Sequence, residues 1–376
     1  MNTQDIITPA ALIDLPCMQR NIDRMQKRIN ELGPKFRPHV KTSKCIEVTR
    51  MQIEAGAQGV TVSTIKEAEQ FFEAGIKDIV YAVGIVPVKL PQVHQLIKRG
   101  CHLKILTDSV ASALAISKYG LEHGLTFDVL IEIDTDDHRS GIKPESDLLL
   151  EVARSLALPG ARIAGVLTHA GSSYDLNTPK ALAAMAEQER SGCVMAATRL
   201  REAGFACPIV SVGSTPTALS AISLEGVTEV RAGVYVFFDL VMHNVGVCRM
   251  DEIALSVLTT VIGHQEEKGW IITDSGWMAM SRDRGTQKQS QDFGYGQVCL
   301  ADGSPLPGYC VTGANQEHGI ISSAVDSDIN VVTKFPVGSQ LRILPNHACA
   351  TGAQFPEYHA VDANGQAEIW SRFYGW

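Results

Sequence analysis

The sequence has little that points to a membrane, to nucleic acid or to secretion. Its net charge is −8 at pH 7, so no basic surface is expected to attract nucleic acid or an anionic membrane. It has no low-complexity segment and no uncharged run long enough to cross a bilayer. Residues Met1–Asp5 lack the basic start and apolar run of a signal peptide.

Closely spaced cysteine pairs are absent too. The nine cysteines are odd in number and scattered, and no two of them form a C-x-x-C motif. That pattern favours reduced thiols over a disulfide framework and predicts a cytoplasmic protein. What is present is ordinary for a globular chain, with 45% apolar and 20% charged residues. The 376 residues suffice for two domains, or for one barrel with an added domain.

One pattern recurs through the first two thirds of the chain, a short apolar run followed by a helical stretch. The runs predicted as strands are Phe36–Lys41, Gly59–Ser63, Asp78–Val83, Leu103–Thr107, Phe127–Asp134, Arg162–His169, Pro208–Gly213 and Val227–Ala232. The segments predicted as helices are Thr64–Ala74, Pro87–Arg99, Val110–His123, Glu145–Leu156, Pro179–Ala203 and Thr217–Leu224.

This alternation predicts an α/β fold of parallel β/α units. Eight such units over about 200–250 residues are the size of a (β/α)8 TIM barrel. A doubly wound open sheet is the main alternative, but no G-x-G-x-x-G fingerprint follows the first strand. Before the first of these strands, an apolar stripe at helical spacing indicates a helix that packs on the core: Met18, Ile22, Met25, Ile29 and Leu32.

The pattern changes after about residue 245, where extended runs alternate with Asp-Gly, Pro-Gly and Asn-Gly turns. The expected strands are Ile253–His264, Gly269–Met280, Gln297–Leu300, Tyr309–Thr312, Gln340–Leu344, Tyr358–Asp362 and Gln366–Trp370. We therefore predict a barrel of residues 16–245 and a C-terminal β-rich domain of residues 246–376. The predicted strand near Ala10–Leu15 would add residues 1–15 to the β-rich domain.

In a (β/α)8 barrel the working residues lie at the C-terminal ends of the strands. There the sequence places Lys41 with His39, Arg139, His169 with Tyr174, the turn Gly213–Thr217, and Arg231–Tyr235. A lysine at a buried strand end costs free energy unless it is paired or neutral, and a neutral lysine forms Schiff bases. Taken alone, an exposed lysine at a strand end is the ordinary explanation.

The turns after the seventh and eighth strands suit a phosphate, because glycine allows close approach and Ser and Thr supply hydroxyls. A lysine across the mouth from a phosphate site suggests pyridoxal 5'-phosphate, which needs both. The alternative is an ordinary phosphosugar barrel without that cofactor.

The C-terminal domain offers a second group. His347 and Cys349 alternate on a predicted extended run, so both side chains face one side and suit zinc or another borderline metal. Two ligands do not close a site, so substrate or water would complete it; the alternative is a buried structural pair. His318 in the polar run 315–319 and Arg282 in the run 281–286 are candidates to contact the substrate, although a solvated loop explains residues 281–286 equally well.

These stretches resemble the D-serine dehydratase and D-threonine aldolase group of fold-type III pyridoxal-phosphate enzymes, which are related to alanine racemase. The resemblance covers nearly the whole chain. It rests on Arg37–Lys44, Asp134–Gly141, Leu167–Ser172, Gly213–Thr215, Arg231–Tyr235, Glu317–Gly319 and Pro345–Cys349.

The resemblance implies an alanine racemase-like (β/α)8 barrel with a C-terminal β-rich domain, and a homodimer. Lys41 would bind the cofactor as a Schiff base, and Arg139 would lie near its phenolic oxygen. His347 and Cys349 would bind a divalent metal such as zinc, manganese or magnesium. Arg231 would lie at the pyridine nitrogen. The phosphate would be held by Ser214, Thr215, Gly233 and Val234. His169 and Tyr174 would supply further contacts to the cofactor.

The implied activity is that of a lyase on β-hydroxy-D-amino acids. The expected reaction dehydrates D-threo-3-hydroxyaspartate, and also D-serine, to a 2-keto acid and ammonia, with Lys41 as the base for the α-proton. The alternative is a D-threonine aldolase, but some aldolases of the group are expected to carry Asp where Cys349 stands. A racemase does not need the metal pair, and a non-catalytic pyridoxal-phosphate carrier lacks the second domain.

Overall fold

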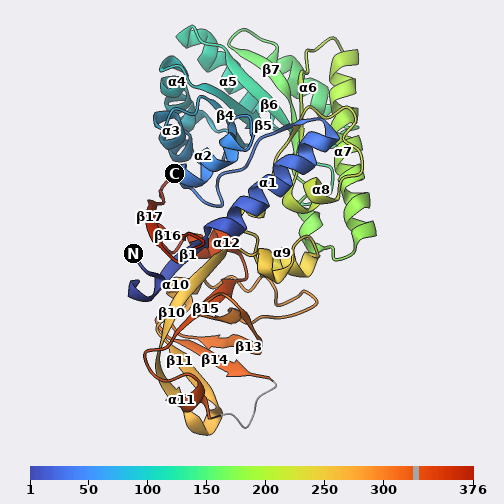
Figure 1. Cartoon of the computed structure of the whole chain (residues 1–376). Coiled ribbons are helices and arrows are strands. Elements are labelled where there is room, and N and C mark those ends of the chain that lie inside the picture. The colour runs from blue at the N-terminus through green and yellow to red at the C-terminus, as the bar shows by residue number, and fades with distance from the viewer. Residues whose placement is uncertain (325–329) are drawn as a thin grey trace. The chain divides into compact units, whose positions relative to one another are not determined.

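The computed structural model describes residues 1–324 and 330–376. Two compact units make up the chain: a barrel unit of residues 24–233 and 373–376, and a β unit of residues 1–23 and 234–372 (Figure 1). The division falls within α1 (Leu15–Leu32) and just before η4 (Val234–Val236), whereas the sequence suggested boundaries after residues 15 and 245. No helix in the described ranges is long and apolar enough to cross a membrane.

The barrel unit is built on eight parallel strands, one for each of the predicted runs. Their spatial order is β2-β9-β8-β7-β6-β5-β4-β3, so neighbours in sequence are mostly neighbours in space. The strands are β2 (Lys35–Phe36), β3 (Val60–Val62), β4 (Asp78–Gly84), β5 (His102–Thr107), β6 (Phe127–Ile133), β7 (Ala161–Thr168), β8 (Ile209–Val212) and β9 (Glu229–Val230).

Backbone bonds of the chain after β2 close this sheet. On one side the Arg37 N–H donates to the Val230 carbonyl over 2.9 Å. On the other side the Val40 N–H donates to Thr61, also over 2.9 Å, and the Thr61 N–H donates to Pro38 over 2.8 Å. This segment therefore lies between β9 and β3, and the predicted closed barrel is confirmed over an open sheet.

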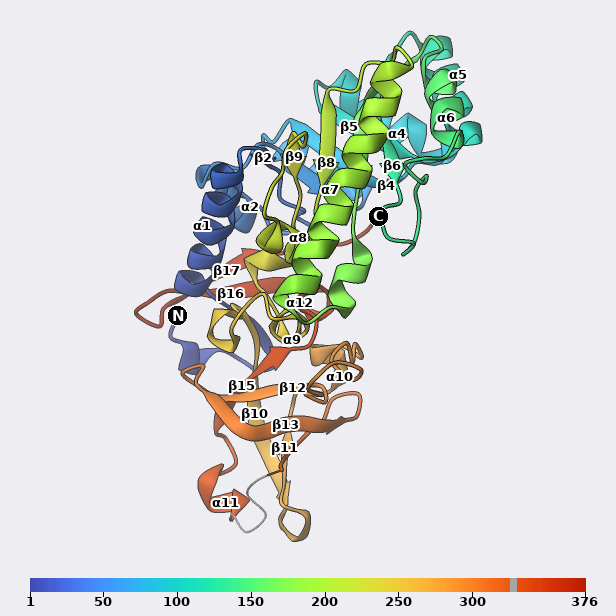
Figure 2. The ribbon, with the colours of Figure 1, turned by 90° about the vertical axis from the view of Figure 1, so that its right-hand side faces the viewer.

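Helices cover the outside of the barrel, and the long α7 packs against β7 and β8 (Figure 2). They are α2 (Ile46–Glu54), α3 (Ile65–Glu73), α4 (Leu90–Lys98) after η2 (Pro87–Lys89), α5 (Val110–His123), α6 (Leu148–Leu156), α7 (Pro179–Glu202) after η3 (Gly171–Asp175), and α8 (Thr215–Ser220). The predicted helix Thr217–Leu224 is wrong at both ends. A reciprocal capping box between Ser214 and Thr217 begins α8 earlier, and the helix already ends at Ser220.

The β unit holds a nine-stranded sheet in the order β11-β14-β13-β12-β15-β10-β1-β16-β17. Its strands are β1 (Ala10–Asp14), β10 (Leu255–Gln265), β11 (Trp270–Thr273), β12 (Gly296–Leu300), β13 (Pro305–Ala314), β14 (Gly319–Ser323), β15 (Gln340–Pro345), β16 (Glu357–Val361) and β17 (Ala367–Ser371). Its helices, apart from the start of α1 and η4, are η1 (Thr3–Asp5), α9 (Leu240–Val245), η5 (Met250–Glu252), η6 (Glu266–Lys268), α10 (Trp277–Met280), α11 (Val331–Lys334) and α12 (Ala348–Gly352).

Two features of the β unit differ from the prediction. The strand β14 was not predicted, and the expected strand Gly269–Met280 ends at Thr273 and is followed by α10. The cause is the turn before β14, whose Asn315 carbonyl accepts the Trp277 N–H over 2.9 Å. Gly276 permits this approach, because a Cβ there would lie 2.2 Å from the Gln316 carbonyl oxygen.

Candidate active site

Lys41 lies in the turn that follows the first barrel strand, next to the bridge between His39 and Thr61. Its side chain is exposed, whereas the neighbouring Thr42 and Ser43 are buried. Within residues 1–324 and 330–376, the Lys41 ammonium forms no hydrogen bond or ion pair. Lys41 is therefore exposed, as the ordinary explanation of a lysine at a strand end expects, and bears no burial cost; it is accessible to a ligand.

Electrostatic coupling shows which side chains the barrel gathers around Lys41. Burial lowers the pKa of His39 well below its usual value, and Lys41, Arg231 and His169 lower it further. Burial likewise lowers the pKa of His169 to about 3, assisted by Lys41, Arg231 and Arg139. The structure thus brings together residues from four strand ends that the sequence placed on one rim.

The His169 imidazole is neutral and its tautomer follows from one contact. Its Nδ1 lies 3.0 Å from the Gly213 carbonyl oxygen, so Nδ1 carries the proton and donates it, and Nε2 is left as an acceptor. The Tyr174 ring centroid lies 6.1 Å from that of His169, so the two rings lie near each other on the segment that follows β7.

Arg139 lies on the loop after β6, and its side chain is 60% exposed. Its Nη2 is 3.9 Å from Glu132 Oε1, which also accepts the Ser140 hydroxyl over 3.0 Å. The guanidinium therefore remains available to an anionic group at the barrel mouth.

The turn after β8 uses its hydroxyls within the protein. Ser214 Oγ lies 2.8 Å from Ser173 Oγ and 3.0 Å from Thr217 Oγ1, and Thr215 is fully buried. Gly213 has a φ of +131°, and a Cβ there would lie 2.0 Å from the Arg231 carbonyl oxygen, so only glycine fits.

The turn after β9 differs, because its backbone donors are available. In the described part of the chain, neither the Gly233 N–H nor the Val234 N–H has an acceptor. A Cβ on Gly233 would lie 3.0 Å from the His39 carbonyl oxygen, so glycine keeps this turn packed against the end of the first strand. Two neighbouring backbone donors of this kind suit a phosphate oxygen.

A buried carboxylate on α7 joins two of these loops, and no sequence pattern predicted it. Glu189 accepts the Ala170 N–H over 2.8 Å and the Gly213 N–H over 3.1 Å. Burial raises the pKa of this carboxyl, against the hydrogen bonds from Thr217, Ala170 and Gly213. A glutamate in a helix is usually solvated, so only the packing of α7 against β7 and β8 shows that this one faces inward.

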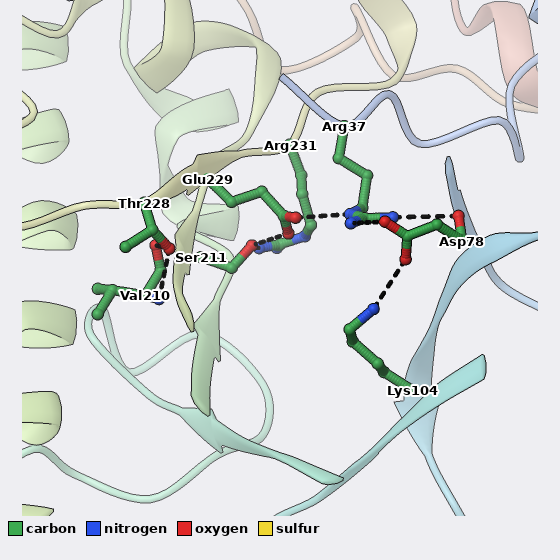
Figure 3. A network of polar contacts seen from close by, with 8 residues as sticks. All are labelled: Arg37, Asp78, Lys104, Val210, Ser211, Thr228, Glu229 and Arg231. Atoms are coloured by element: carbon green, nitrogen blue, oxygen red, sulfur yellow. Dashed lines mark hydrogen bonds and ion pairs between the residues drawn. The ribbon is translucent and has the colours of Figure 1, made fainter. Parts of the chain in front are cut away.

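A chain of polar contacts crosses the barrel interior beneath the rim, and the sequence did not predict it either (Figure 3). Arg231 donates to the Ser211 hydroxyl, which in turn donates to Glu229. Glu229 also accepts from Arg37, whose guanidinium donates to Asp78. Glu229 and Arg231 alternate along one strand, so both side chains face the barrel interior.

In the β unit, His347 and Cys349 lie together, but not on the predicted extended run. His347 is extended and caps α12, while Cys349 lies inside that helix. The helix begins here because the buried Asp239 carboxylate accepts the Ala348 N–H over 2.9 Å. The thiol of Cys349 still forms a hydrogen bond with His347, so the two donor atoms are adjacent.

Asp283 completes the surroundings of His347 and was missed in the sequence. Its Oδ2 lies 2.7 Å from His347 Nδ1, which leaves Nε2 for a ligand. Burial lowers the pKa of His347, but Asp283, Cys349 and Asp239 outweigh it and the net shift is upward. The arginines of residues 281–286 suggested a loop that binds an anionic substrate group. Nothing in the sequence linked Asp283 to His347, which lies 64 residues further along the chain.

Asn346 fixes the two segments to each other. Its Nδ2 donates to the Asp283 carbonyl over 3.2 Å and to the Gly294 carbonyl over 2.8 Å. Its Oδ1 accepts the Thr286 hydroxyl over 2.9 Å. The residues before α12 and the loop after α10 therefore form one rigid group around His347.

Arg282 and His318, predicted to contact substrate, are both exposed. The Arg282 guanidinium lies 4.9 Å from the centre of the Trp277 ring, and His318 lies in the turn between β13 and β14. Across the described residues, neither forms a hydrogen bond or ion pair with His347 or Cys349. The described ranges also hold no group of three or more His, Cys, Asp or Glu able to bind a metal.

A closed β/α barrel with an accessible lysine after its first strand, joined to an antiparallel β domain, defines the alanine racemase-like class of enzymes. The comparisons agree. Residues 13–241 match the alanine racemase N-terminal domain family, and residues 254–361 match the putative serine dehydratase domain family.

The chain is 62% identical over 371 residues to D-threo-3-hydroxyaspartate dehydratase of Delftia sp. (strain HT23), covering 98% of each chain. It is 28% identical to a D-threonine aldolase of Arthrobacter sp, covering 92% of this chain and 86% of the relative. The solved structure of D-threo-3-hydroxyaspartate dehydratase from Delftia sp. HT23 has a TM-score of 0.99 to this chain at 61% identity, covering 100% of both. A cysteine-to-alanine mutant of D-threo-3-hydroxyaspartate dehydratase, solved in the metal-free form, gives the same values.

The chain therefore belongs to the alanine racemase-like family, on the branch of the D-threo-3-hydroxyaspartate and D-serine dehydratases. The relatives on this branch are dehydratases and aldolases, which confirms the prediction of a lyase. The higher identity to the dehydratase favours dehydration over the aldolase alternative.

Proposed function

We propose that this chain is a lyase that depends on pyridoxal 5'-phosphate and a divalent metal and dehydrates D-threo-3-hydroxyaspartate to oxaloacetate and ammonia. The observation that carries the proposal is the group of His347, Cys349 and Asp283, because a dehydratase must assist a poor leaving group and a racemase need not. Identity to the Delftia enzyme along nearly the whole chain supports the choice of substrate.

The barrel residues fit the cofactor. Lys41 is accessible at the rim, and Arg231 keeps one buried donor, Nε–H, for which the described residues offer no acceptor. The Gly233 and Val234 N–H groups are available to a phosphate, and the exposed Arg139 to a phenolic oxygen. Ser214 and Thr215 would act through the backbone of the turn, since the Ser214 hydroxyl is engaged inside the protein. His169 and Tyr174 would line the same mouth.

The β-unit residues fit the metal. An imidazole and a thiol side by side suit zinc, or a borderline ion such as manganese, better than magnesium, which prefers oxygen ligands. Asp283 bonded to Nδ1 fixes the imidazole ring and raises the basicity of Nε2, as carboxylates behind metal-binding histidines commonly do. Water or substrate would complete the coordination.

The chemistry divides between what the bound groups supply and what the chain does. The cofactor supplies an electron sink for charge at the α-carbon, and the metal supplies a Lewis acid for the departing hydroxide. Lys41 would take the α-proton as a neutral amine, since its side chain is exposed at the barrel mouth and no described residue pairs with it. His169 stays neutral with its proton on Nδ1, so its Nε2 accepts a hydrogen bond and has no proton to donate. Of the three residues considered for assisting the leaving hydroxyl, this leaves Tyr174 and His318 as proton donors.

Product analysis tests the proposal directly. The purified protein is incubated with D-threo-3-hydroxyaspartate, pyridoxal phosphate and Mn²⁺ or Zn²⁺, and oxaloacetate, ammonia, glycine and glyoxylate are quantified. Equal amounts of oxaloacetate and ammonia support the proposal. Glycine with glyoxylate would show Cα–Cβ cleavage and establish the aldolase alternative instead.

Two controls make this result specific. The L-threo isomer should give no product, because the proposal names a D-amino acid. Chelation with EDTA should remove turnover and added metal should restore it. D-serine is the second substrate to test. Turnover of D-serine but not of D-threo-3-hydroxyaspartate would support a lyase activity but would change the substrate that we assign to it.

The family resemblance leads us to expect a homodimer, and the scattered, odd-numbered cysteines lead us to expect a cytoplasmic protein. Light scattering coupled to size exclusion measures the mass of the particle against the 40.7 kDa chain. A mass near that of one chain at micromolar concentration would contradict the dimer.

A further inference from the structure

Arg231 is buried in the barrel interior, and its three kinds of donor are used unequally. Its Nη1 donates to Ser211 Oγ over 3.0 Å, and its Nη2 donates to the Thr168 carbonyl over 2.7 Å. Its Nε–H is buried and finds no acceptor anywhere in residues 1–324 and 330–376. A buried donor without an acceptor costs free energy, so this N–H indicates a place for an acceptor from a ligand.

The direction of each bond shows what holds Arg231. A serine hydroxyl has one proton, and a carboxylate can only accept, so Ser211 must donate to Glu229 Oε1, 2.7 Å away. The lone pairs of Ser211 Oγ are then left for Arg231, which can only donate. Glu229 therefore orients Ser211, and Ser211 orients Arg231.

Glu229 is itself held from the opposite side. It lies on β9, between β8 with Ser211 and β2, and its Oε2 accepts the Arg37 Nε–H over 2.6 Å. Arg37 donates to Asp78 Oδ2 over 2.8 Å, and Lys104 donates to Asp78 Oδ1 over 2.7 Å (Figure 3). Along this series of side-chain contacts, from Lys104 to Arg231, the charges alternate in sign. Each charged group therefore has an oppositely charged neighbour or is linked to one through a hydroxyl.

We propose that Ser211 and Glu229 are positioning residues that hold Arg231 with its Nε–H directed at a heteroaromatic nitrogen of the cofactor, the pyridine nitrogen of pyridoxal phosphate. This inference rests on the proposed function. A guanidinium keeps its proton, so a ring nitrogen that accepts from it stays unprotonated. The relay thereby sets both the affinity for the cofactor and the protonation state of its ring.

Ser211→Ala is the sharpest probe, because it removes one hydroxyl and leaves every charge in place. Thr228→Val is its matched control: Thr228 Oγ1 accepts the Val210 N–H over 2.9 Å between the same two strands, and it has no part in the Arg231 contacts. Glu229→Gln is less informative alone, since it also disturbs the buried Arg37.

The experiment titrates cofactor-free protein with pyridoxal phosphate and follows the absorption of the bound cofactor over a range of pH. Ser211→Ala should weaken the apparent affinity by about tenfold, the size expected for a hydrogen bond to a charged group, and should shift the pH dependence of the absorption. Thr228→Val should stay within about twofold of the original protein. Melting temperatures of all variants, measured without cofactor, separate these effects from loss of folding.

A double-mutant cycle tests whether Ser211 acts through Arg231. Arg231→Lys keeps the charge but not the planar fork, so adding Ser211→Ala to it should produce no further loss of affinity. Additive losses would overturn the inference. So would a Ser211→Ala protein with the affinity and spectrum of Thr228→Val, or one whose affinity falls only in step with its melting temperature. If the original protein binds no pyridoxal phosphate at all, the proposed function fails first.

Discussion

The barrel unit and the β unit assemble their candidate groups in opposite ways. The barrel unit draws its residues from several strand ends, where no loop is distinctive alone and parallel topology brings them to one rim. The β unit relies on two segments, residues 281–294 and 344–351, which Asn346 ties together. A cofactor site spread over many loops should tolerate the loss of one contact, whereas a two-ligand metal site should not.

The two units also treat charge differently. In the barrel unit Lys104, Asp78, Arg37 and Glu229 neutralise one another in a chain that leads to Arg231. In the β unit one imidazole, that of His347, lies among the acidic groups Asp283, Cys349 and Asp239, which raise its pKa. Variants of Lys41 and of His347 test whether the barrel group and the β-unit group can be disabled independently.

The largest expected effect is that of Lys41→Ala. Without the amine, turnover should fall by about 10⁴-fold, because both the covalent attachment and the base are lost. The absorption of the covalently bound cofactor should disappear, while the metal content stays that of the original protein. Lys35→Ala, an exposed lysine on β2, serves as control. Full activity in Lys41→Ala would refute the assignment of the barrel mouth.

His347→Ala should produce the converse. Turnover should fall by about 10³-fold with the loss of the Lewis acid, and the metal content measured by atomic emission should drop to background. The absorption of the bound cofactor should persist. Loss of that absorption together with the metal would show that the two groups are not independent. His102→Ala, an exposed histidine of the barrel unit, controls for a general effect.

Asp283→Asn sharpens the comparison within the β unit. The side chain keeps its shape but loses its charge, so metal affinity should weaken by about 10–100-fold, as is usual for partners behind a metal ligand. Competition with a metal chelator measures this change, and excess metal should restore turnover. Asp251→Asn, which alters an exposed ion pair with Arg249 in the same unit, should leave the affinity unchanged. Equal affinities for both variants would contradict the role of Asp283.

The smallest expected effect concerns stability and pH in the barrel unit. The pKa values of His39 and His169 are lowered in the folded state, so below pH 6.5 the unfolded chain binds protons that the folded chain does not. Stability of the cofactor-free protein should therefore be retained above pH 6.5 and fall as the pH drops from 6.5 towards about 3. Each histidine contributes up to about 1.4 kcal/mol per pH unit. Urea unfolding at pH 7, 6 and 5 measures the slope, which should be smaller in His169→Gln.

The barrel was predictable because its signals are local. Strand and helix runs such as Asp78–Val83 and Val110–His123 follow from periodicity, and a parallel sheet then places Lys41, His169 and Arg231 at one rim without knowledge of any contact. The resemblance to the dehydratase and aldolase group was predictable for the same reason, since it rests on short continuous stretches.

What the sequence could not give depends on pairs that lie far apart in the chain. Asp283 and His347 are 64 residues apart, and Arg37 and Glu229 are 192 apart. Nothing local distinguishes Glu189 or Asp239 from a solvated carboxylate. The sequence predicts an extended run at Cys349, whereas this residue lies in a helix. That helix begins where the distant Asp239 accepts the Ala348 N–H, and no local periodicity indicates such a contact.

By itself the sequence determined the closed barrel, the β-rich continuation and the family, and it predicted the residues proposed to carry the chemistry, since strand periodicity and short motifs are written in consecutive residues. Only the tertiary structure decided which carboxylates stand behind them and how Ser211 and Glu229 hold Arg231. The physical reason is burial: a charge is stabilised inside a protein only by a partner of suitable geometry, and folding alone brings that partner from elsewhere in the chain.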